Sequence, residues 1–407
     1  MSERDSINTK DRETSSDSVL YVINDVGGPK TRSSSVAQYQ FSKSVCDDFN
    51  TYIISKTPIK EPSLNKMSTK SFTPPGNVYI RNILFPFFVI YVYILYRKDI
   101  RLLITGGDGS IHLPTIPISI LSDSNWVIFE WDSPDWRHNR RREYEDRVNL
   151  EFMYREVMFL VSRLSYTISD QVFLSDKTEL IKEGQKTTFI GGADCRKINK
   201  VESKTPPSNN RYKDMKRVVY VGNMYYHRGI DLILEAADQC GSDFQLVLIG
   251  PSPEESENEN FLPQGISSFQ DLLNNYDIEY EYLGVLDHED ALSEMTKSDI
   301  GICILPYERG MNDYRLSYPI KVFEYMNSGL ALLCSETPAM KDVIGNNQLT
   351  QNDSTDIAKN LGRMLRDEDH LNEMKQNNKD SGPEYCWENI RPTISEELKK
   401  YMKDTDA

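Results

Sequence analysis

The strongest constraint on the fold is an alternation of short apolar runs and helical stretches in the second half of the chain. Each run has the length of a β-strand and is followed by Gly or Pro; the runs cover residues 218–221, 245–249 and 300–305. Such alternation is typical of βαβ units and a parallel sheet. In an open parallel sheet the ligand lies beyond the carboxyl ends of the strands. We therefore expect the binding edge at Gly222, Gly250, Gly284 and Pro306.

The first half of the chain shows the same alternation. Expected strands cover residues 18–23, 52–54, 101–105, 126–130, 166–169 and 187–190, and expected helices cover residues 32–46, 83–96, 140–164 and 177–183. Because 407 residues are long for a single core, the sequence predicts an α/β protein with two doubly wound, Rossmann-like domains. The expected divisions are a disordered tail at 1–17, a first domain at 18–205, a linker at 206–216, a second domain at 217–385 and a closing helix at 386–407.

The charge of the chain is unevenly distributed. Residues 1–216 hold 31 Lys and Arg against 27 Asp and Glu, whereas residues 217–407 hold 16 against 35. The acidic half argues against nucleic-acid binding, because that affinity comes from cations at the phosphates. The first half could approach an anionic membrane or a phosphorylated acceptor. An acidic surface that keeps the protein soluble in high salt is the alternative.

The six cysteines form no CxxC pair, and Cys303 and Cys334 lie in apolar runs. We interpret them as reduced, buried side chains. Together with the polar amino terminus, which has no apolar signal segment, this predicts a cytoplasmic protein.

The most hydrophobic stretch of the chain runs from Ile83 to Tyr96 and is flanked by Arg81, Arg97 and Lys98. It is shorter than the roughly 20 residues that span a bilayer. We favour a helix buried against the sheet of the first domain. The alternative is a helix partly exposed at a membrane interface, where aromatic rings and flanking cations are favourable.

Glycine-rich turns mark the expected site in the first domain. Gly27 and Gly28 follow the first expected strand and would let the backbone approach a ligand at a helix amino terminus. A second such turn, Gly106-Gly107-Asp108-Gly109, follows the expected strand at 101–105. Asp108 would bond a substrate hydroxyl or cap its own turn.

In the second domain, Arg228 follows Gly222 and Asn223 at the start of a helix, a position that suits a diphosphate. Lys321 and Glu324 begin a later helix on one face. They form a local ion pair, or else Lys321 binds phosphate while Glu324 accepts bonds from ribose hydroxyls.

Several segments together resemble the retaining glycosyltransferases of family 4, which have the GT-B fold of two facing Rossmann-like domains. VVYVGNMYYHRGIDLILEA is similar to the strand, glycine and Arg-x4-Lys-Gly element of that family, and SYPIKVFEYMNSGLALLCSETPAMKDVI to its nucleotide-sugar element. GGADCRKI resembles its turn before the linker, and WENIRPTISEELKKYM its closing helix that crosses back to the first domain. The resemblance extends from about residue 19 to residue 401.

The resemblance also implies roles for single residues. The phosphate-binding Arg–Lys pair of the family falls on Asn223 and Arg228, so one cation is missing and one is replaced by another cation. Its Glu-x7-Glu motif falls on Leu316 and Glu324, so only the ribose-binding carboxylate is retained. Its central His-Asp falls on Trp131 and Asp132, which leaves Asp132 as the polar group facing the reacting sugar.

The resemblance implies transfer of a sugar from a nucleotide-diphosphate sugar to an acceptor, a hexosyltransferase reaction with retention at the anomeric carbon. The catalytic residues would be Asp132, Arg228 and Lys321. Donor-binding residues would be Gly27, Gly28, Gly222, Asn223, Arg228, Gly250, Pro306, Lys321 and Glu324. No metal is required by these motifs, and the acceptor would be a lipid-linked or cell-surface glycan at the inner face of the membrane. The alternatives are a non-catalytic GT-B partner subunit and a GT-B sugar-nucleotide epimerase.

Overall fold

The structure, a computed structural model of the chain, describes residues 18–24, 33–59, 70–107, 109–130, 150–174, 186–203, 215–241, 243–254, 262, 266–309 and 315–403. The chain divides into two compact units. The first comprises Met1–His138, Arg147–Ile190 and Arg391–Ala407, and the second comprises Asn139–Asp146 and Gly191–Ile390. This division falls at Gly191, whereas the sequence placed it at 206. The expected linker at 206–216 and the tail at 1–17 lie almost entirely outside the described residues.

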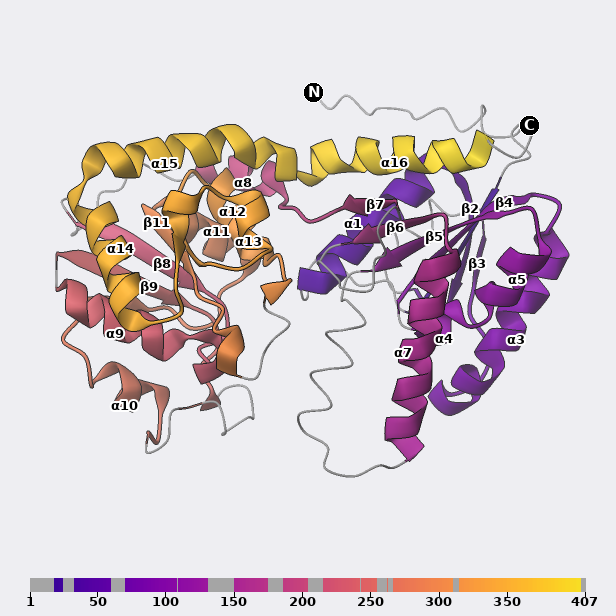
Figure 1. Cartoon of the computed structure of the whole chain (residues 1–407), viewed down its shortest axis with the longest axis horizontal. Coiled ribbons are helices and arrows are strands. Elements are labelled where there is room, and N and C mark those ends of the chain that lie inside the picture. Colours follow the sequence, from indigo (N-terminus) through magenta and orange to yellow (C-terminus); the bar gives the residue numbers. More distant parts are fainter. Residues whose placement is uncertain are drawn as a thin grey trace, which may run out of the picture. The chain divides into compact units, whose positions relative to one another are not determined.

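The first unit is built on one seven-stranded sheet with the order β3-β2-β1-β4-β5-β6-β7, and all its strand pairs are parallel. Its elements are β1 (Ser18–Ile23), α1 (Ser33–Asp48), β2 (Asn50–Ser55), β3 (Lys70–Phe72), α3 (Val78–Tyr96), β4 (Ile100–Gly106), α4 (Gly109–His112), α5 (Thr115–Leu121), β5 (Asn125–Glu130), α7 (Leu150–Ile168), β6 (Gln171–Leu174) and β7 (Thr187–Phe189). Right-handed crossovers place α1 on one face of the sheet and α3, α4, α5 and α7 on the other (Figure 1).

The second unit contains a parallel six-stranded sheet with the order β10-β9-β8-β11-β12-β13. Its strands are β8 (Lys216–Val221), β9 (Phe244–Ile249), β10 (Tyr280–Tyr282), β11 (Ile300–Cys303), β12 (Ala331–Ser335) and β13 (Leu349–Thr350). Its helices are α8 (Cys195–Glu202), α9 (Ile230–Cys240), α10 (Phe269–Leu273), α11 (His288–Thr296), α12 (Ile320–Asn327), α13 (Met340–Val343), α14 (Ser354–Arg366) and α15 (Glu368–Ser381), with short 3-10 turns η1 (Tyr226–Arg228), η4 (Tyr307–Arg309), η6 (Asn346–Gln348) and η7 (Gly382–Tyr385). The sequence-based fold class, two parallel-sheet Rossmann-like domains, is confirmed.

The last helix, α16 (Trp387–Lys403), begins in the second unit, and its residues from Arg391 onward belong to the first. Its last turns are fixed to the sheet of the first unit by polar contacts. The Tyr401 hydroxyl donates to Gln171 Oε1 at 2.7 Å, and the Asn125 side-chain amide donates to the Tyr401 carbonyl at 2.6 Å.

Two sequence-based expectations for the first unit are wrong. Residues 166–169 end helix α7 instead of forming a strand, which begins at Gln171. The helix expected at 83–96 extends over Val78–Tyr96 and is not buried. Only one stripe of α3, including Phe85, Val89 and Val92, packs in the core, because a helix on a sheet buries one side and this helix is apolar all round.

Candidate functional site

In each sheet the strand order reverses between two central strands, which is where doubly wound folds bind ligands. In the second unit these strands are β8 and β11, which are neighbours although the chain continues from β8 to β9 on one side and from β11 to β12 on the other. The first residue after β8 is Gly222, with φ of +149°, and the first after β9 is Gly250, with φ of +137°. A Cβ atom on Gly250 would lie 2.0 Å from the carbonyl oxygen of Gly222. Glycine is therefore required here, and the strand ends present bare backbone to a ligand.

A cation stands directly over this glycine edge. Lys321, in the first turn of α12, places Nζ 4.3 Å from the ring centroid of Tyr220 and 3.1 Å from the position of a Cβ on Gly222. Burial lowers the pKa of Lys321, although the nearby thiols Cys303 and Cys334 favour its charged form. Among the described residues no carboxylate pairs with Lys321. A partly desolvated ammonium beside bare backbone is a place for a bound anion.

Arg228 brings a second positive charge to the same place. It ends the turn η1, and its charge opposes protonation of Lys321, so both cations act on one region. The following Gly229 has φ of +74°, and a Cβ there would lie 2.9 Å from Ile304 and 3.2 Å from Pro306. The turn that carries Arg228 therefore packs directly on the residues that follow β11.

An ion pair fixes this turn to the segment after Pro306. Arg309 donates to both carboxylate oxygens of Asp231, at 2.6 and 2.8 Å, and to the Tyr226 carbonyl at 2.7 Å. Its guanidinium also lies 4.0 Å from the ring centroid of Tyr226. Two parallel hydrogen bonds to one carboxylate define the orientation of both groups. The sequence analysis missed this clamp, because its partners are 78 residues apart.

Glu324 lies one turn after Lys321 in α12 and is 9% exposed. Its Oε1 is 2.7 Å from Nε2 of His288, the first residue of α11. The hydrogen bond to Glu324 raises the pKa of His288, whereas burial opposes that shift. Of the two alternatives for Lys321 and Glu324, the local ion pair is absent from the described contacts, since Glu324 pairs with His288 instead.

The structure thus brings most of the expected donor-binding residues to one sheet edge: Gly222, Asn223, Arg228, Gly250, Pro306, Lys321 and Glu324. Asn223 is held there by the Tyr220 hydroxyl, which donates to its carbonyl at 2.9 Å. Gly284 also belongs to this edge, because its carbonyl accepts from the Gly250 amide at 2.8 Å. Gly27, Gly28, Asp108, Trp131 and Asp132 lie outside the described residues, so the expected site of the first unit stays a prediction.

Residues 201–381, which include this whole edge, match a sequence family described as glycosyl transferases group 1. No curated protein matches the full sequence. Among solved structures, the chain is similar to sucrose-phosphate synthase from Thermosynechococcus elongatus, with a TM-score of 0.64 and 14% identity over 94% of this chain and 98% of that one.

Two further structures show the same fold. HepE of Anabaena in complex with UDP gives a TM-score of 0.64 and 14% identity over 94% of this chain and 100% of that one. A glycosyltransferase from Rickettsia africae gives a TM-score of 0.59 and 14% identity over 95% of this chain and 99% of that one. The chain therefore has the GT-B fold, and the implied fold is confirmed.

The first unit contains a buried polar network at β4 and β5. His112 Nδ1 and Trp126 Nε1 lie 2.9 and 3.0 Å from Thr105 Oγ1, and the Tyr166 hydroxyl donates to Glu130 at 3.1 Å. His112 Nε2 is 3.7 Å from the same Glu130 oxygen. Sequence reasoning missed this network, which ties α4 and α7 to the strand ends beside Gly106.

The second unit contains a disulfide between Cys195 and Cys386, so the expectation that all six cysteines are reduced is wrong for these two. It joins the start of α8 to the residue before α16. Backbone hydrogen bonds reinforce it, from the Ala193 amide to the Tyr385 carbonyl at 2.8 Å and from the Trp387 amide to the Ala193 carbonyl at 3.0 Å. Glu388 lies close enough to complete a set of three metal-ligand types, but neither sulfur is a free thiolate.

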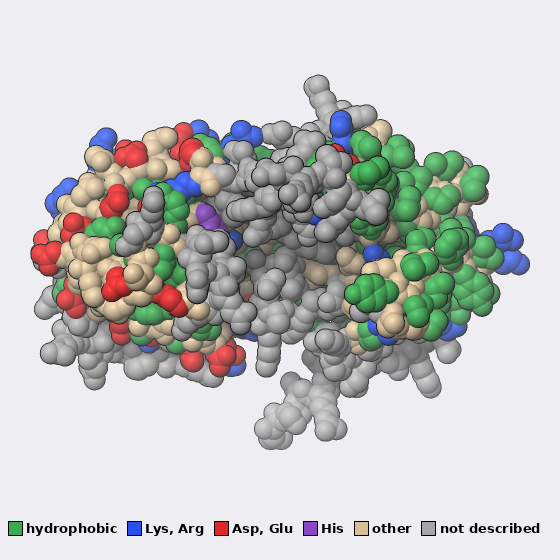
Figure 2. Space-filling model, turned by 90° about the horizontal axis from the view of Figure 1, so that it is seen from below, with side chains coloured by type: hydrophobic (Ala, Val, Ile, Leu, Met, Phe, Trp, Pro, Cys, Tyr) green, Lys and Arg blue, Asp and Glu red, His purple; other side chains and the backbone are tan. Residues whose placement is uncertain are grey.

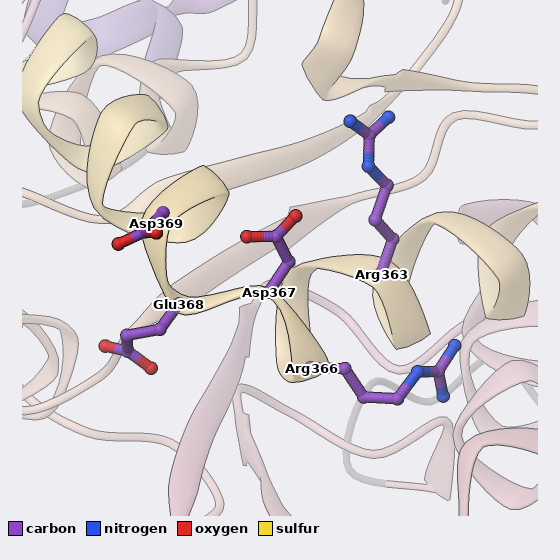
Figure 3. A pocket seen from close by; sticks show the side chains of 5 residues that line it. All are labelled: Arg363, Arg366, Asp367, Glu368 and Asp369. Carbon is purple, nitrogen blue, oxygen red and sulfur yellow. The ribbon is translucent and has the colours of Figure 1, made fainter.

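A pocket of the second unit lies away from the glycine edge, where α14 meets α15. It is lined by Arg363, Arg366, Asp367, Glu368 and Asp369, whose side chains diverge (Figure 3). Asp367 caps α15 by accepting from the His370 amide at 3.0 Å. These residues therefore form a helix junction with a solvated polar face.

Proposed function

We propose that the protein is a retaining glycosyltransferase of family 4 that transfers a sugar from a nucleotide-diphosphate sugar to an acceptor hydroxyl or phosphate. The observation that carries this proposal is the desolvated Lys321 beside Arg228 over the bare backbone of Gly222 and Gly250. Charge develops on the leaving diphosphate in such a reaction, and preorganised cations and backbone amides stabilise it most where water is excluded.

Each group of the edge then has a chemical role. Arg228 and Lys321 bind the diphosphate and neutralise its charge without a metal, and Glu324 accepts hydrogen bonds from the ribose. Asp132, which the resemblance places opposite the reacting sugar, would complete the set. Because Leu316 replaces the first carboxylate of the motif, we expect slower transfer than a site with both carboxylates would give.

The donor base that we propose is uracil. The support comes from similar folds, since HepE was solved with UDP and with UDP-glucose, and an Escherichia coli protein with UDP-2-fluoro glucose. A thermal-shift series with UDP-, GDP- and ADP-sugars tests the choice, because a ligand at 100 times its Kd stabilises by about 2.7 kcal/mol.

The decisive experiment follows the sugar. Purified protein is incubated with UDP-glucose, and hydrolysis or transfer is recorded together with the anomeric configuration of the product. We expect an α-linked product and its loss in Arg228→Ala, but not in Arg363→Ala, an exposed arginine of α14. A product of inverted configuration would refute retention.

The alternative of a non-catalytic partner subunit is favoured by Leu316 and Asn223, where the family has a carboxylate and a cation. It predicts nucleotide binding without turnover. Binding that depends on Arg228 and Lys321, with no hydrolysis or transfer for any sugar nucleotide, would establish the subunit and overturn the enzyme.

The setting that we propose is the cytoplasmic face of the cell membrane, with a lipid-linked or cell-surface glycan as acceptor. The exposed apolar side of α3 supports membrane contact through the 83–96 segment. The disulfide removes one argument for the cytoplasm, because disulfides are rare in reducing compartments. Thiol alkylation in intact cells tests the location, since full oxidation of Cys195 and Cys386 in the cellular protein would contradict a cytoplasmic setting.

A further inference from the structure

The exposed apolar side chains of the protein are concentrated on one surface of the first unit. Apart from Tyr226 and Val285, every exposed large hydrophobic side chain of the described residues lies on α3, on α7 or between them in sequence at 113–121. They are Tyr79, Ile80, Ile83, Leu84, Phe87, Tyr91, Ile94, Leu95, Leu113, Ile120, Leu121, Met153, Tyr154, Val157, Leu160 and Leu164. Figure 2 shows hydrophobic side chains gathered over this end of the molecule.

Helix α7 shows that the exposed apolar surface does not come from α3 alone. Its residues 153, 154, 157, 160 and 164 follow helical spacing and form a stripe that points outward, whereas Ser162, Ser165 and Tyr166 are buried. An amphipathic helix normally turns its apolar stripe to the core. Here the stripe faces outward on the same side of the sheet as α3. Contiguous apolar surfaces of this kind mark interaction sites.

The surface borders the carboxyl edge of the sheet of the first unit. In a parallel sheet a helix that follows one strand and precedes the next begins at the carboxyl ends of the strands. Both α3, after β3, and α7, before β6, therefore start at that edge. The amino-terminal half of α3 is also its most exposed part, with Tyr79 at 81% and Phe87 at 70%.

We propose that α3, α5 and α7 form one docking surface for an anionic lipid bilayer, with α3 lying in the head-group plane. Helix α3 contains no Asp or Glu, its first turn contains Arg81, and Arg97 and Lys98 follow its end before Asp99. Apolar and aromatic side chains between terminal cations suit lipid tails and anionic head groups.

The composition of the surface favours lipid over a protein partner. A specific protein interface carries about ten direct hydrogen bonds, but the polar side chains at the exposed, described positions of α3, α5 and α7 are only three Tyr, one Asn, one Arg and one Thr. The apolar stretch Tyr79–Tyr96 has the length and composition of a helix that could cross a membrane. It docks instead of spanning, because Phe85, Val89 and Val92 belong to the core of the unit and would leave it.

Vesicle binding tests this surface without donor or acceptor, so its outcome is independent of the proposed catalysis. The full chain is sedimented with vesicles of phosphatidylcholine alone and with added phosphatidylglycerol. The variant is Ile83→Gln/Phe87→Gln/Leu160→Gln, and the matched control is Val285→Gln, because Val285 is 67% exposed in the other unit. Circular dichroism checks that both remain folded.

We expect the triple variant to lower the partition coefficient roughly 100-fold, since each side chain removes apolar area from the membrane contact. Val285→Gln should bind like the unchanged protein, and binding should be tighter with phosphatidylglycerol and weaken with salt. Equal sedimentation of the triple variant and the control would overturn the proposal. So would self-association of the chain, abolished by the triple variant, without any vesicle binding.

The His288–Glu324 pair points independently to a positioning residue of the donor site. Oε1 of Glu324 is held by His288 at 2.7 Å, and Oε2 accepts no hydrogen bond from a described residue. We infer that His288 fixes the carboxylate so that Oε2 is free for a ribose hydroxyl. This role rests on the proposed function.

We expect the hydrogen bond between His288 and Glu324 to depend on pH. The groups that act on His288 are Glu324 of α12 and, beside α8, Lys197 and Asp194, of which only Lys197 disfavours its charged form. Its own helix adds Asp287, Glu289 and Asp290, and Glu289 pairs with Lys200 at 3.2 Å. Glu324 raises the pKa of His288 above 6.5. The charge-assisted bond is therefore complete below pH 6.5 and is lost as the pH rises through the folded pKa.

Calorimetric binding of UDP between pH 6 and 8.5 tests this role, with His288→Gln and His288→Ala as variants. As the pH rises from 6 to 8.5, the affinity of the unchanged protein for UDP should fall roughly fivefold more than that of His288→Gln. The reason is that a charged hydrogen bond is about twice as strong as a neutral one. Because UDP titrates in the same way in both measurements, the ratio of the two affinities does not contain its titration. His288→Ala should bind several-fold more weakly than His288→Gln at every pH.

If all three proteins bind UDP with the same affinity and pH profile, His288 has no positioning role. The proposed donor site would be unaffected by that result. Absence of binding by any nucleotide would instead overturn the proposed function, and this role with it.

Discussion

The disulfide between Cys195 and Cys386 makes a strong prediction about stability. Its two cysteines are 191 residues apart, and the loop that they close contains nearly all of the second unit, Gly191–Ile390. Removing the cross-link lets the unfolded chain explore far more conformations, whereas the folded unit keeps its hydrogen bonds around Ala193 and Trp387. Both cysteines are buried.

The magnitude follows from the length of the loop. Chain entropy gives about 5 kcal/mol for a loop closed over 191 residues, the upper end of what disulfides contribute. A domain of about 200 residues has an unfolding entropy near 0.4 kcal/mol/K. Loss of the cross-link should therefore lower the Tm of the second unit by about 10 °C, and by half of that if the unfolded state retains structure.

Calorimetry of the oxidised protein and of Cys195→Ala/Cys386→Ala measures this difference. Cys240→Ala, which removes a half-buried free thiol from the same unit, is the control and should change the Tm little. Reductant should then lower the Tm of the unchanged protein but not that of the double variant. Peptide mapping that finds both cysteines as free thiols, or a double variant with an unchanged Tm, would refute the reasoning.

Three further outcomes are expected in the second unit. Gly250→Ala should lose at least 2 kcal/mol of unfolding free energy through backbone collision, whereas Gly241→Ala, with φ of +83° in open space, should lose only about 1 kcal/mol; equal losses would contradict the collision. Arg309→Lys should weaken UDP binding several-fold, because lysine cannot make the paired bonds to Asp231; an unchanged Kd would show that the Arg309–Asp231 pair does not contribute to donor binding. Lys321→Met should weaken UDP binding about 10- to 100-fold and yet leave the ligand-free Tm equal or higher, because it removes a desolvated charge; a lower Tm would show that the ammonium stabilises the fold.

Local patterns were enough to predict the framework of the second unit. Strands β8, β9 and β11 are apolar runs that end near Gly or Pro, and each lies within two residues of its expected bounds. The expected strands omitted β10 and β13, which have three and two residues, because such short segments show no periodicity. They also gave no bounds for β12, although Cys334 lies in an apolar run.

The partners of the site residues were beyond sequence reasoning for a physical reason. Glu324 meets His288 across 36 residues and Arg309 meets Asp231 across 78, so only the fold brings them together. The error at residues 166–169 has a local cause. Tyr166 is apolar enough for a strand, but it continues the buried side of α7, and the strand begins only at Gln171.

Helix α3 shows how one pattern supports two opposite structures. A helix that is apolar all round is either enclosed by protein or surrounded by lipid, and the sequence cannot distinguish these environments because both select the same side chains. The structure distinguishes the two environments, because only 17% of the Tyr79–Tyr96 window is buried by protein. An aqueous monomer that exposed Ile83, Phe87 and Tyr91 would gain stability by covering them. The outward stripe of α7 would gain in the same way, so a single apolar environment along both helices accounts for the two faces at once.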